Sequence, residues 1–395
     1  MSQFGLRPRS WLALCMLLTL TGCSTVKGWF TLDEDDGTDP VPLVDIVSEV
    51  KIRKVWSTGV GDGQGDGFYH LRPAIDGDVI YAAGNDGTVL ALDRISGKRR
   101  WKQDLDLPLS GGVGIGSGMV LLGTSDGEIL ALNQADGNTL WASQVQGEVL
   151  APPQTNGRVV IVQSYDGRLQ ALSAEDGGEL WVYDSNLPVL SLRGTSTPII
   201  FERIAIAAFG NGKVQAFDLE TGAVRWEARV AIAQGRSEID RIVDIDGSMV
   251  MVSSNLFAVS YQGRVAAIDI ATGRKLWQEE VSSYSGVDQG FGNIYVAEES
   301  GSVIAYHRNG QGVRWEQSAL TNRRVSTPKT VKGYVAVGDL EGYVHFMSQV
   351  DGHFVGRTKV GSNGIRANML SEDNILYVFE NGGTLAALQV SSLDK

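Results

Sequence analysis

The fold is decided by residues 86–101, DGTVLALDRISGKRRW, because the chain repeats this pattern along most of its length. The same arrangement returns forty residues later at 126–141, DGEILALNQADGNTLW, and again at 166–181, DGRLQALSAEDGGELW. In each copy an Asp-Gly pair precedes a short apolar run, a second glycine follows, and a tryptophan closes the unit fourteen positions after the first glycine. Similarity at this period is typical of repeat architectures in which every unit is one small supersecondary structure.

The first glycine of the pattern marks eight units, at residues 87, 127, 167, 212, 263, 301, 342 and 383. Short apolar runs alternate with turn residues inside a unit, and no segment shows sustained helical periodicity. Around the first copy we expect a strand beginning at Pro73 and strands over 79–82, 89–93 and 99–101, joined by glycine turns. Four antiparallel strands in about 40 residues are typical of a β-propeller blade. The sequence therefore predicts an all-β, eight-bladed propeller.

The two ends of the chain predict how the ring closes. The last unit begins at Gly383 and stops after its third strand near Val390, without a fourth strand or a tryptophan. At the other end, Trp56 lies in a strand-like segment 45 residues before Trp101 and has no unit before it. We therefore expect the N-terminal strand to complete the eighth blade. The repeated tryptophans are expected to pack, semi-buried, between neighbouring blades.

Composition argues against several kinds of partner and site. The formal net charge of −12 disfavours a sequence-independent grip on nucleic acid and attachment to an anionic lipid surface by charge alone. Of the two cysteines, Cys15 lies in a segment expected to be removed, so the mature chain would keep only Cys23 and form no internal disulfide. The four histidines stand in no HxH or HExxH arrangement, and we expect no metal site.

The N-terminus has the pattern of a secretion signal. Arg7 and Arg9 precede an apolar stretch over 11–20 that is too short to cross a bilayer stably as a helix. The stretch leads into Leu-Thr-Gly-Cys23, which resembles the bacterial lipobox; the alternative is an ordinary signal peptide with a chance cysteine. The resemblance implies acylation of Cys23 and, with Ser24 after it, sorting to the outer membrane with the protein facing the periplasm. We expect a signal peptide at 1–22, a lipidated N-terminus and flexible acidic tether at 23–50, and the propeller at 51–395.

The repeat resembles that of dehydrogenases that use pyrroloquinoline quinone (PQQ), and two families with such repeats compete. The quinoprotein enzymes need a quinone clamp, a Ca²⁺ site and a catalytic aspartate, and commonly an adjacent-cysteine disulfide that this mature chain cannot form. The other family is BamB, the lipoprotein subunit of the machinery that inserts β-barrels into outer membranes. The chain resembles it in lipobox, acidic tether, eight repeats and closing strand, and in the segments 190–194, LSLRG, and 238–241, EIDR. This resemblance implies a non-catalytic scaffold, with no cofactor, that aids folding and insertion of outer-membrane proteins.

A glycine-rich segment, GDGQGDG at 61–67, also resembles the corresponding loop of the BamB family. Asp62 and Asp66 offer oxygen ligands for calcium, but the EF-hand spacing and its distal glutamate are missing. We interpret the segment as a flexible loop that leaves the closing strand.

The spacing of the repeats indicates a binding surface. Successive first glycines lie 40, 40, 45, 51, 38, 41 and 41 residues apart, and the two longest intervals flank Gly212. The extra residues fall after Trp181 and Trp226, in connections that share one propeller face with the Asp-Gly hairpins. An apolar patch with an arginine and surrounding carboxylates is a reasonable protein-docking site. The candidate residues are Leu190, Leu192, Arg193, Asp240, Arg241, Asp244 and Asp246.

The resemblance implies that this surface docks on the periplasmic POTRA region of BamA within the BAM complex, on the inner leaflet of the outer membrane. Unfolded outer-membrane proteins could pair with an exposed blade edge as a second mode. Alternatively, the leucines pack under their own loop and the charges are merely solvated. A quinoprotein dehydrogenase and a glycan- or peptidoglycan-binding propeller are the competing functions.

Overall fold

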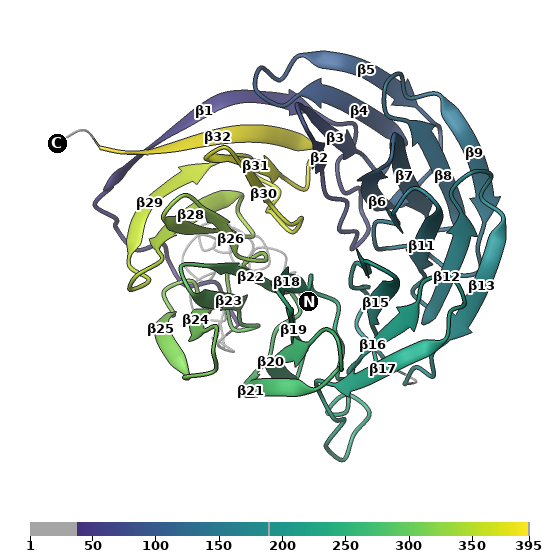
Figure 1. Ribbon diagram of the computed structural model, residues 1–395. Coiled ribbons are helices and arrows are strands. Elements are labelled where there is room, and N and C mark those ends of the chain that lie inside the picture. The colour runs from purple at the N-terminus through teal and green to yellow at the C-terminus, as the bar shows by residue number, and fades with distance from the viewer. Residues whose placement is uncertain (1–37, 189, 394–395) are drawn as a thin grey trace, which may run out of the picture. The chain divides into compact units, whose positions relative to one another are not determined.

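The computed structural model describes residues 38–393 except residue 189, so Cys23 and the expected signal peptide lie outside the described part. The regular structure of the described residues consists of 32 strands in eight four-stranded antiparallel sheets. Figure 1 shows these sheets arranged as blades around a ring within residues 40–393. The predicted all-β, eight-bladed propeller is therefore confirmed. No helix in this described part is long and apolar enough to span a membrane.

Seven blades take their four strands consecutively from the chain. Blade one consists of β2 (Ala74–Asp76), β3 (Val79–Ala83), β4 (Thr88–Asp93) and β5 (Arg99–Asp104), and blade two of β6 (Leu109–Gly116), β7 (Met119–Thr124), β8 (Glu128–Asn133) and β9 (Thr139–Gln144). Blade three consists of β10 (Gln154–Thr155), β11 (Val159–Gln163), β12 (Arg168–Ser173) and β13 (Glu179–Asp184), and blade four of β14 (Ile199–Phe201), β15 (Ile204–Ala208), β16 (Lys213–Asp218) and β17 (Val224–Arg229). Blade five consists of β18 (Val250–Val252), β19 (Asn255–Val259), β20 (Gly263–Asp269) and β21 (Lys275–Val281). Blade six consists of β22 (Val287–Gly290), β23 (Asn293–Ala297), β24 (Val303–His307) and β25 (Val313–Gln317), and blade seven of β26 (Lys329–Val331), β27 (Tyr334–Gly338), β28 (Tyr343–Ser348) and β29 (Phe354–Lys359).

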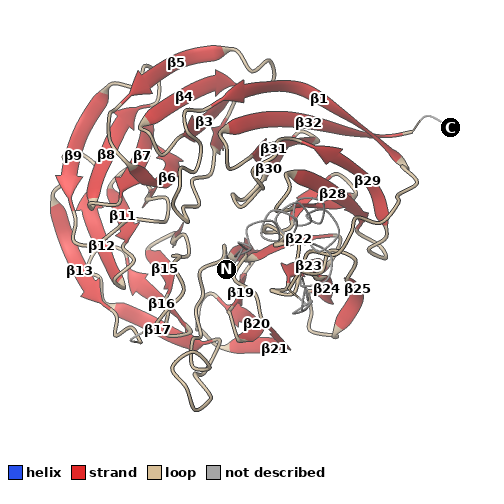
Figure 2. Cartoon of the chain, turned by 180° about the vertical axis from the view of Figure 1, so that it is seen from behind, coloured by secondary structure: helices blue, strands red, loops and turns tan. Residues whose placement is uncertain are grey.

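The eighth blade joins the two ends of the described chain. Its strand order is β1-β32-β31-β30, with β1 (Val50–Gly59) outermost, followed by β32 (Thr384–Ser392), β31 (Ile375–Phe379) and β30 (Leu370–Glu372). Strand β1 pairs antiparallel with β32, from Val50 opposite Ser392 to Gly59 opposite Thr384. Both ribbon views show these two strands side by side (Figures 1 and 2). The predicted seam, completed by the strand that carries Trp56, is confirmed.

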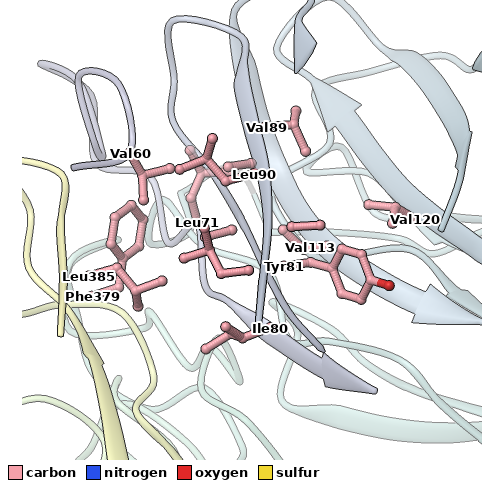
Figure 3. Close-up of a cluster of buried hydrophobic side chains, with 14 of the residues drawn as sticks. Val60, Leu71, Ile80, Tyr81, Val89, Leu90, Val113, Val120, Phe379 and Leu385 are labelled. Carbon is pink, nitrogen blue, oxygen red and sulfur yellow. The ribbon is translucent and has the colours of Figure 1, made fainter. Parts of the chain in front are cut away.

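Apolar side chains cover both faces of the two middle strands of a blade, because each blade is sandwiched between two neighbours. At the seam, one hydrophobic cluster joins the first and last blades (Figure 3). It contains Leu71, which precedes β2, and Ile80 of β3, together with Phe379 and Leu385 of blade eight. Burial of this cluster excludes water between the first and last blades. Packing therefore reinforces the closure that the β1–β32 hydrogen bonds begin.

Each repeated tryptophan fastens its blade to the next one. The indole Nε1 of Trp141 donates a 2.9 Å hydrogen bond to the carbonyl of Ala174 in the following blade. Its ring covers Gly177, where an added Cβ would lie 2.7 Å from the ring. The second glycine of the repeat is thus the position on which the preceding tryptophan packs. The same indole-to-carbonyl bond joins Trp56 to Arg94, Trp101 to Gln134, Trp181 to Leu219, Trp226 to Ile270, Trp277 to Arg308 and Trp315 to Gln349.

Blade seven departs from this rule, since Gly356 stands where the tryptophan is expected. An added Cβ there would lie 2.8 Å from Val50 and 3.2 Å from Ile52, two side chains of the closing strand. The closing strand therefore fills the space that a tryptophan occupies at the other blade junctions.

The glycine loop at 61–67 is fastened to the seam, and its interpretation as a flexible loop is wrong. Gln64 is fully buried, and its side-chain amide exchanges two hydrogen bonds with the backbone of Leu71. The backbone N–H of Gln64 donates to the carbonyl of Asn381 in blade eight, while the N–H of Asn85 in blade one donates to the carbonyl of Gly63. Glycines allow this close backbone approach, which ties the end of β1 to both the first and the last blade.

We expect Gly63→Ala to lower the free energy of unfolding by about 2–3 kcal/mol. The added Cβ would lie 2.2 Å from the amide nitrogen of Gly383, and the φ of Gly63 is +61°. Gly77→Ala is the matched control, because Gly77 has a similar φ of +55° but open space around its Cβ position. Urea unfolding followed by tryptophan fluorescence measures both variants. Equal losses of unfolding free energy in the two variants would show that the seam accommodates a methyl group at position 63.

The chain joins the ring before the boundary predicted at residue 51. Arg323, which precedes β26, donates a 3.0 Å hydrogen bond to the carbonyl of Val41, and Arg357 of β29 donates a 3.1 Å bond to the carbonyl of Val44. The chain from Pro40 onward accordingly forms one structural unit. The segment 40–49, assigned to the tether by sequence, is instead held against blade seven, so the predicted boundary needs this correction. Backbone carbonyls bound by distant arginines leave no pattern in the sequence of the segment itself.

Candidate functional site

Two long connections distinguish the middle of the ring. The first loop, residues 185–198, joins β13 of blade three to β14 of blade four, and the second loop, residues 230–249, joins β17 to β18 of blade five. Both lead from an outermost strand to the innermost strand of the next blade. A long loop beside β17 and β21 extends beyond the rim in both ribbon views (Figures 1 and 2). The predicted insertions therefore lie in neighbouring connections of the same kind.

The two loops touch each other and form one surface. The backbone N–H of Leu192 in the first loop donates a 3.0 Å hydrogen bond to Oδ2 of Asp244 in the second. The hydroxyl of Ser196 donates a 3.0 Å bond to the carbonyl of Gly247. Gly194 allows the close approach, since an added Cβ would lie 2.6 Å from Cγ of Asp246. The cavity between the loops measures about 20 Å³, which is room for a water molecule.

Arg193 is held in place by side chains from three other connections. Its guanidinium bonds Glu148 at 2.6 Å and lies 5.7 Å and 6.0 Å from the ring centres of Tyr69 and Tyr165. The ion pair and the aromatic rings restrict the side chain while 42% of it stays exposed. The sequence did not indicate Tyr69, Glu148 and Tyr165, because no repeat or motif relates these connections to Arg193.

The leucines of the first loop divide into two groups. Leu187 packs onto the hydrophobic cluster that contains Trp181, as the alternative interpretation of the loop expected. Leu190 is 43% exposed, and Leu192 is half-buried at the surface next to Arg193. An apolar and cationic patch therefore remains accessible on the first loop.

Asp240 and Arg241 lie in an exposed turn of the second loop. Asp240 accepts a hydrogen bond from the backbone N–H of Ser237. Hydrogen bonding with the Ser237 side chain, followed by this backbone bond, lowers the pKa of the Asp240 carboxyl. Arg241 is 3.8 Å from the carboxylate of Glu238. Beside them Ile239 is 67% exposed. This turn therefore offers a second accessible patch.

Asp244 does not border the surface as the sequence suggested, because it is only 3% exposed. Burial raises the pKa of Asp244, and burial together with the neighbouring Asp244 charge raises the pKa of Asp246. The two carboxyls position the first loop through Leu192 and Gly194 and are not available as a pair of free charges. The sequence Val-Asp-Ile-Asp at 243–246 does not reveal which side chains face inward, because loop side chains follow no fixed period.

Asp244 makes stability depend on pH. Because its pKa is raised in the folded protein, this group favours folding below about pH 4, and the contribution is lost as the pH rises toward neutral. In Asp244→Asn the side chain still accepts the hydrogen bond from the Leu192 N–H but no longer titrates. We therefore expect the unfolding free energy of this variant to fall less between about pH 4 and pH 7 than that of wild type. The difference should be about 1.4 kcal/mol for each unit by which the pKa of Asp244 is higher in the folded than in the unfolded chain. Urea midpoints measured across this range test the expectation. Asp240→Asn is the control, since its lowered pKa places its titration below the range; identical profiles for wild type and Asp244→Asn would contradict the assignment.

The fold and the paired loops define a class: an eight-bladed repeat propeller whose enlarged connections build a binding surface on one side of the ring. A family model described as outer membrane protein assembly factor BamB matches residues 47–141 and 85–317. The chain belongs to the BamB family of outer membrane protein assembly factors.

Individual relatives agree with this assignment. The chain is 56% identical over 377 residues to the outer membrane protein assembly factor BamB of Pseudomonas aeruginosa, covering 95% of this chain and 97% of the relative. It is similar to the crystal structure of BamB from Moraxella catarrhalis, with a TM-score of 0.79, 29% identity and coverage of 86% of this chain and 100% of that one. Quinohemoprotein alcohol dehydrogenase from Comamonas testosteroni shares the fold alone, with a TM-score of 0.70, 13% identity and coverage of 90% and 80%.

Proposed function

We propose that the chain is a non-catalytic scaffold subunit of the outer-membrane β-barrel assembly machinery, and that it docks on the periplasmic POTRA region of BamA. The observation that carries this proposal is the pair of hydrogen-bonded loops, which holds Leu190, Leu192 and Arg193 in a preorganised surface. Preorganised side chains lose little conformational freedom on binding, so their contacts contribute more fully to affinity. The relatives' printed name, outer membrane protein assembly factor, supports this class of function over catalysis.

The residues of the surface take different roles in this proposal. Leu190, Leu192 and Arg193 contact the partner, because apolar and arginine side chains dominate the energetics of protein interfaces. Asp240 and Arg241 form an exposed polar border on the second loop. The buried Asp244 and the half-buried Asp246 act through the position of the first loop.

The proposal includes the site of action. Acyl chains on Cys23 would hold the protein on the inner leaflet of the outer membrane, with the ring in the periplasm. From there the ring would aid the folding and insertion of outer-membrane proteins as part of the complex. Neither role requires a cofactor.

Crosslinking in cells tests the docking surface. A photoreactive amino acid at position 190 or 241 is expected to give an adduct with BamA, because both side chains are exposed on the paired loops. Position 95 is the control, since Ile95 is 47% exposed in the turn between β4 and β5 of blade one, whereas the two loops join blades three, four and five. Adducts from position 95 but from neither loop would overturn the assignment. Adducts with unfolded client chains alone would favour a client-binding role instead.

A further inference from the structure

We propose that a cavity near the axis of the ring binds a small oxyanion, with phosphate or carboxylate groups, through the guanidinium of Arg72. This inference does not depend on the docking surface proposed above. The cavity measures about 220 Å³, whereas pockets for drug-sized ligands measure roughly 300–1,000 Å³. The volume therefore restricts the ligand to a small molecule.

Residues from four blades line this axial cavity. Gln154 lies in β10 of blade three, Ile199 lies in β14 of blade four, and Ser248 lies just before β18 of blade five. Each of these strands is the innermost of its blade, and Figure 1 shows β18 close to the centre of the ring. Arg72, which precedes β2, adds a residue from blade one. The cavity therefore lies where the inner strands surround the central channel of the propeller.

Arg72 reaches the cavity through its long side chain. Its backbone N–H donates a 2.9 Å hydrogen bond to the carbonyl of Gly112 in β6, and its carbonyl accepts a 2.8 Å bond from the N–H of Val113. These bonds hold the backbone of Arg72 at the junction of blades one and two. The rest of the lining belongs to blades three, four and five, so the side chain spans the distance between them.

The charge of Arg72 has no partner within the described part of the chain. No described residue forms an ion pair or a hydrogen bond with its guanidinium. Burial lowers the pKa of Arg72 to about 10, which still leaves the group charged at neutral pH. The buried arginines elsewhere are neutralised, since Arg94 pairs with Asp373 and Arg323 with Asp339. An anion in the cavity would give Arg72 the partner that buried charges ordinarily have.

Two hydroxyl groups add hydrogen-bond donors to the cavity. The Oγ of Ser248 accepts a hydrogen bond from the amide of Asn368, which leaves its own O–H available to a ligand. The hydroxyl of Thr197 forms no hydrogen bond with any described residue and is available in the same way. The bond from Ser196 to the carbonyl of Gly247 holds Thr197 and Ser248 close together, because each is the next residue in its chain segment.

The donors of the cavity fit an oxyanion better than a neutral or cationic ligand. A guanidinium presents its N–H groups in a planar fork that matches two oxygens of a carboxylate or a phosphate. Among the described residues, no aspartate or glutamate lines the cavity to compete for this fork. A neutral or cationic ligand would leave the charge of Arg72 unpaired. Arg72 is therefore expected to bind two ligand oxygens, with Thr197 and Ser248 as further donors.

Isothermal titration of the intact purified chain with sodium phosphate and, separately, with sodium malonate tests the site. We expect saturable binding of one or both anions at a single site, and none of sodium chloride at the same ionic strength. Binding of phosphate alone would identify phosphate groups as the ligand chemistry, and binding of malonate alone would identify carboxylates. Failure of both anions to bind would overturn the inference.

Replacing Arg72 makes the test specific. Arg72→Gln should raise the dissociation constant at least about 10-fold, because it removes the charged donors. Arg274→Gln is the matched control, since Arg274 is an exposed arginine in the turn between β20 and β21 and should leave binding unchanged. Without added anion, the urea unfolding midpoint of Arg72→Gln should equal or exceed that of wild type, because the variant no longer buries an unpaired charge.

Unfolding measurements separate binding from a general effect of salt. An anion that binds only the folded chain should raise the midpoint of wild type progressively with its concentration, and should raise that of Arg72→Gln much less. Equal increases in the two proteins would show that phosphate acts only by exclusion from the surface and would exclude the site.

Thr197→Val keeps the test decisive if Arg72→Gln fails to fold. This variant is nearly isosteric and loses only the hydroxyl donor, so it should weaken binding by about 3-fold or more. Wild-type affinity in a folded Thr197→Val variant, together with wild-type affinity in Arg72→Gln or failure of that variant to fold, would overturn the assignment of the axial cavity.

Discussion

Trp141→Ala lowers the free energy of unfolding of the ring by about 3–5 kcal/mol in our expectation, the largest stability loss of any single change considered. Trp141 is 8% exposed, and its removal leaves a cavity between blades two and three. The carbonyl of Ala174 loses its indole donor, and Gly177 loses the ring that covers it. Urea unfolding monitored by circular dichroism measures the loss without relying on the deleted fluorophore.

Two further variants separate the causes of this loss of unfolding free energy. Trp141→Phe keeps an aromatic ring against Gly177 but removes the N–H donor, so it should cost less than the alanine variant. Leu140→Ala, next in the chain and 50% exposed, should stay within about 0.5–1 kcal/mol of wild type. If Leu140→Ala lowered the free energy of unfolding as much as Trp141→Ala, the tryptophans would not be the side chains that hold neighbouring blades together.

The double variant Leu192→Ala/Arg193→Ala should weaken binding to the POTRA region of BamA by about 30-fold or more, which corresponds to a loss of at least about 2 kcal/mol. Leu192 contributes apolar surface, and Arg193 is already positioned by Glu148 and two tyrosines. Isothermal titration with the purified periplasmic region gives the dissociation constant directly.

The matched control removes one leucine and one arginine elsewhere on the ring. Leu180 is 52% exposed on β13, and the Arg203 side chain is 74% exposed before β15, so Leu180→Ala/Arg203→Ala should bind as wild type does. The midpoint of urea unfolding should be unchanged in both double variants, since the replaced side chains lie at the surface. Undiminished binding by a folded Leu192/Arg193 variant would remove the paired loops from the proposed interface.

The sequence predicted the fold because a propeller is periodic. The tryptophan and the second glycine recur in most units for a local reason, namely that one blade's tryptophan packs on the second glycine of the next blade. The seam followed from the same count, since Trp56 was left without a unit and Gly383 without a tryptophan. Periodicity therefore made long-range pairing visible in the sequence.

The site was less predictable because its contacts are particular to it. Interval lengths located both loops, yet they did not distinguish the exposed Asp240 from the buried Asp244. Neither did they indicate Tyr69 or Tyr165, which reach Arg193 from distant connections. The glycine loop at 61–67 looked mobile in sequence for the same reason, since its partners lie at both ends of the chain.

The pairing of β1 with β32 has a consequence for the order of folding. Arg53 and Gln389 face each other across this pair although they are 336 residues apart in the chain. A chain synthesised from its N-terminus presents β1 first, yet the partner strand β32 follows only after the seven intervening blades. Until then β1 has an unpaired edge, which in other proteins invites pairing with foreign strands. The chain should therefore be most vulnerable to aggregation before β32 is available, and truncations that remove β32 should aggregate even though seven blades are complete.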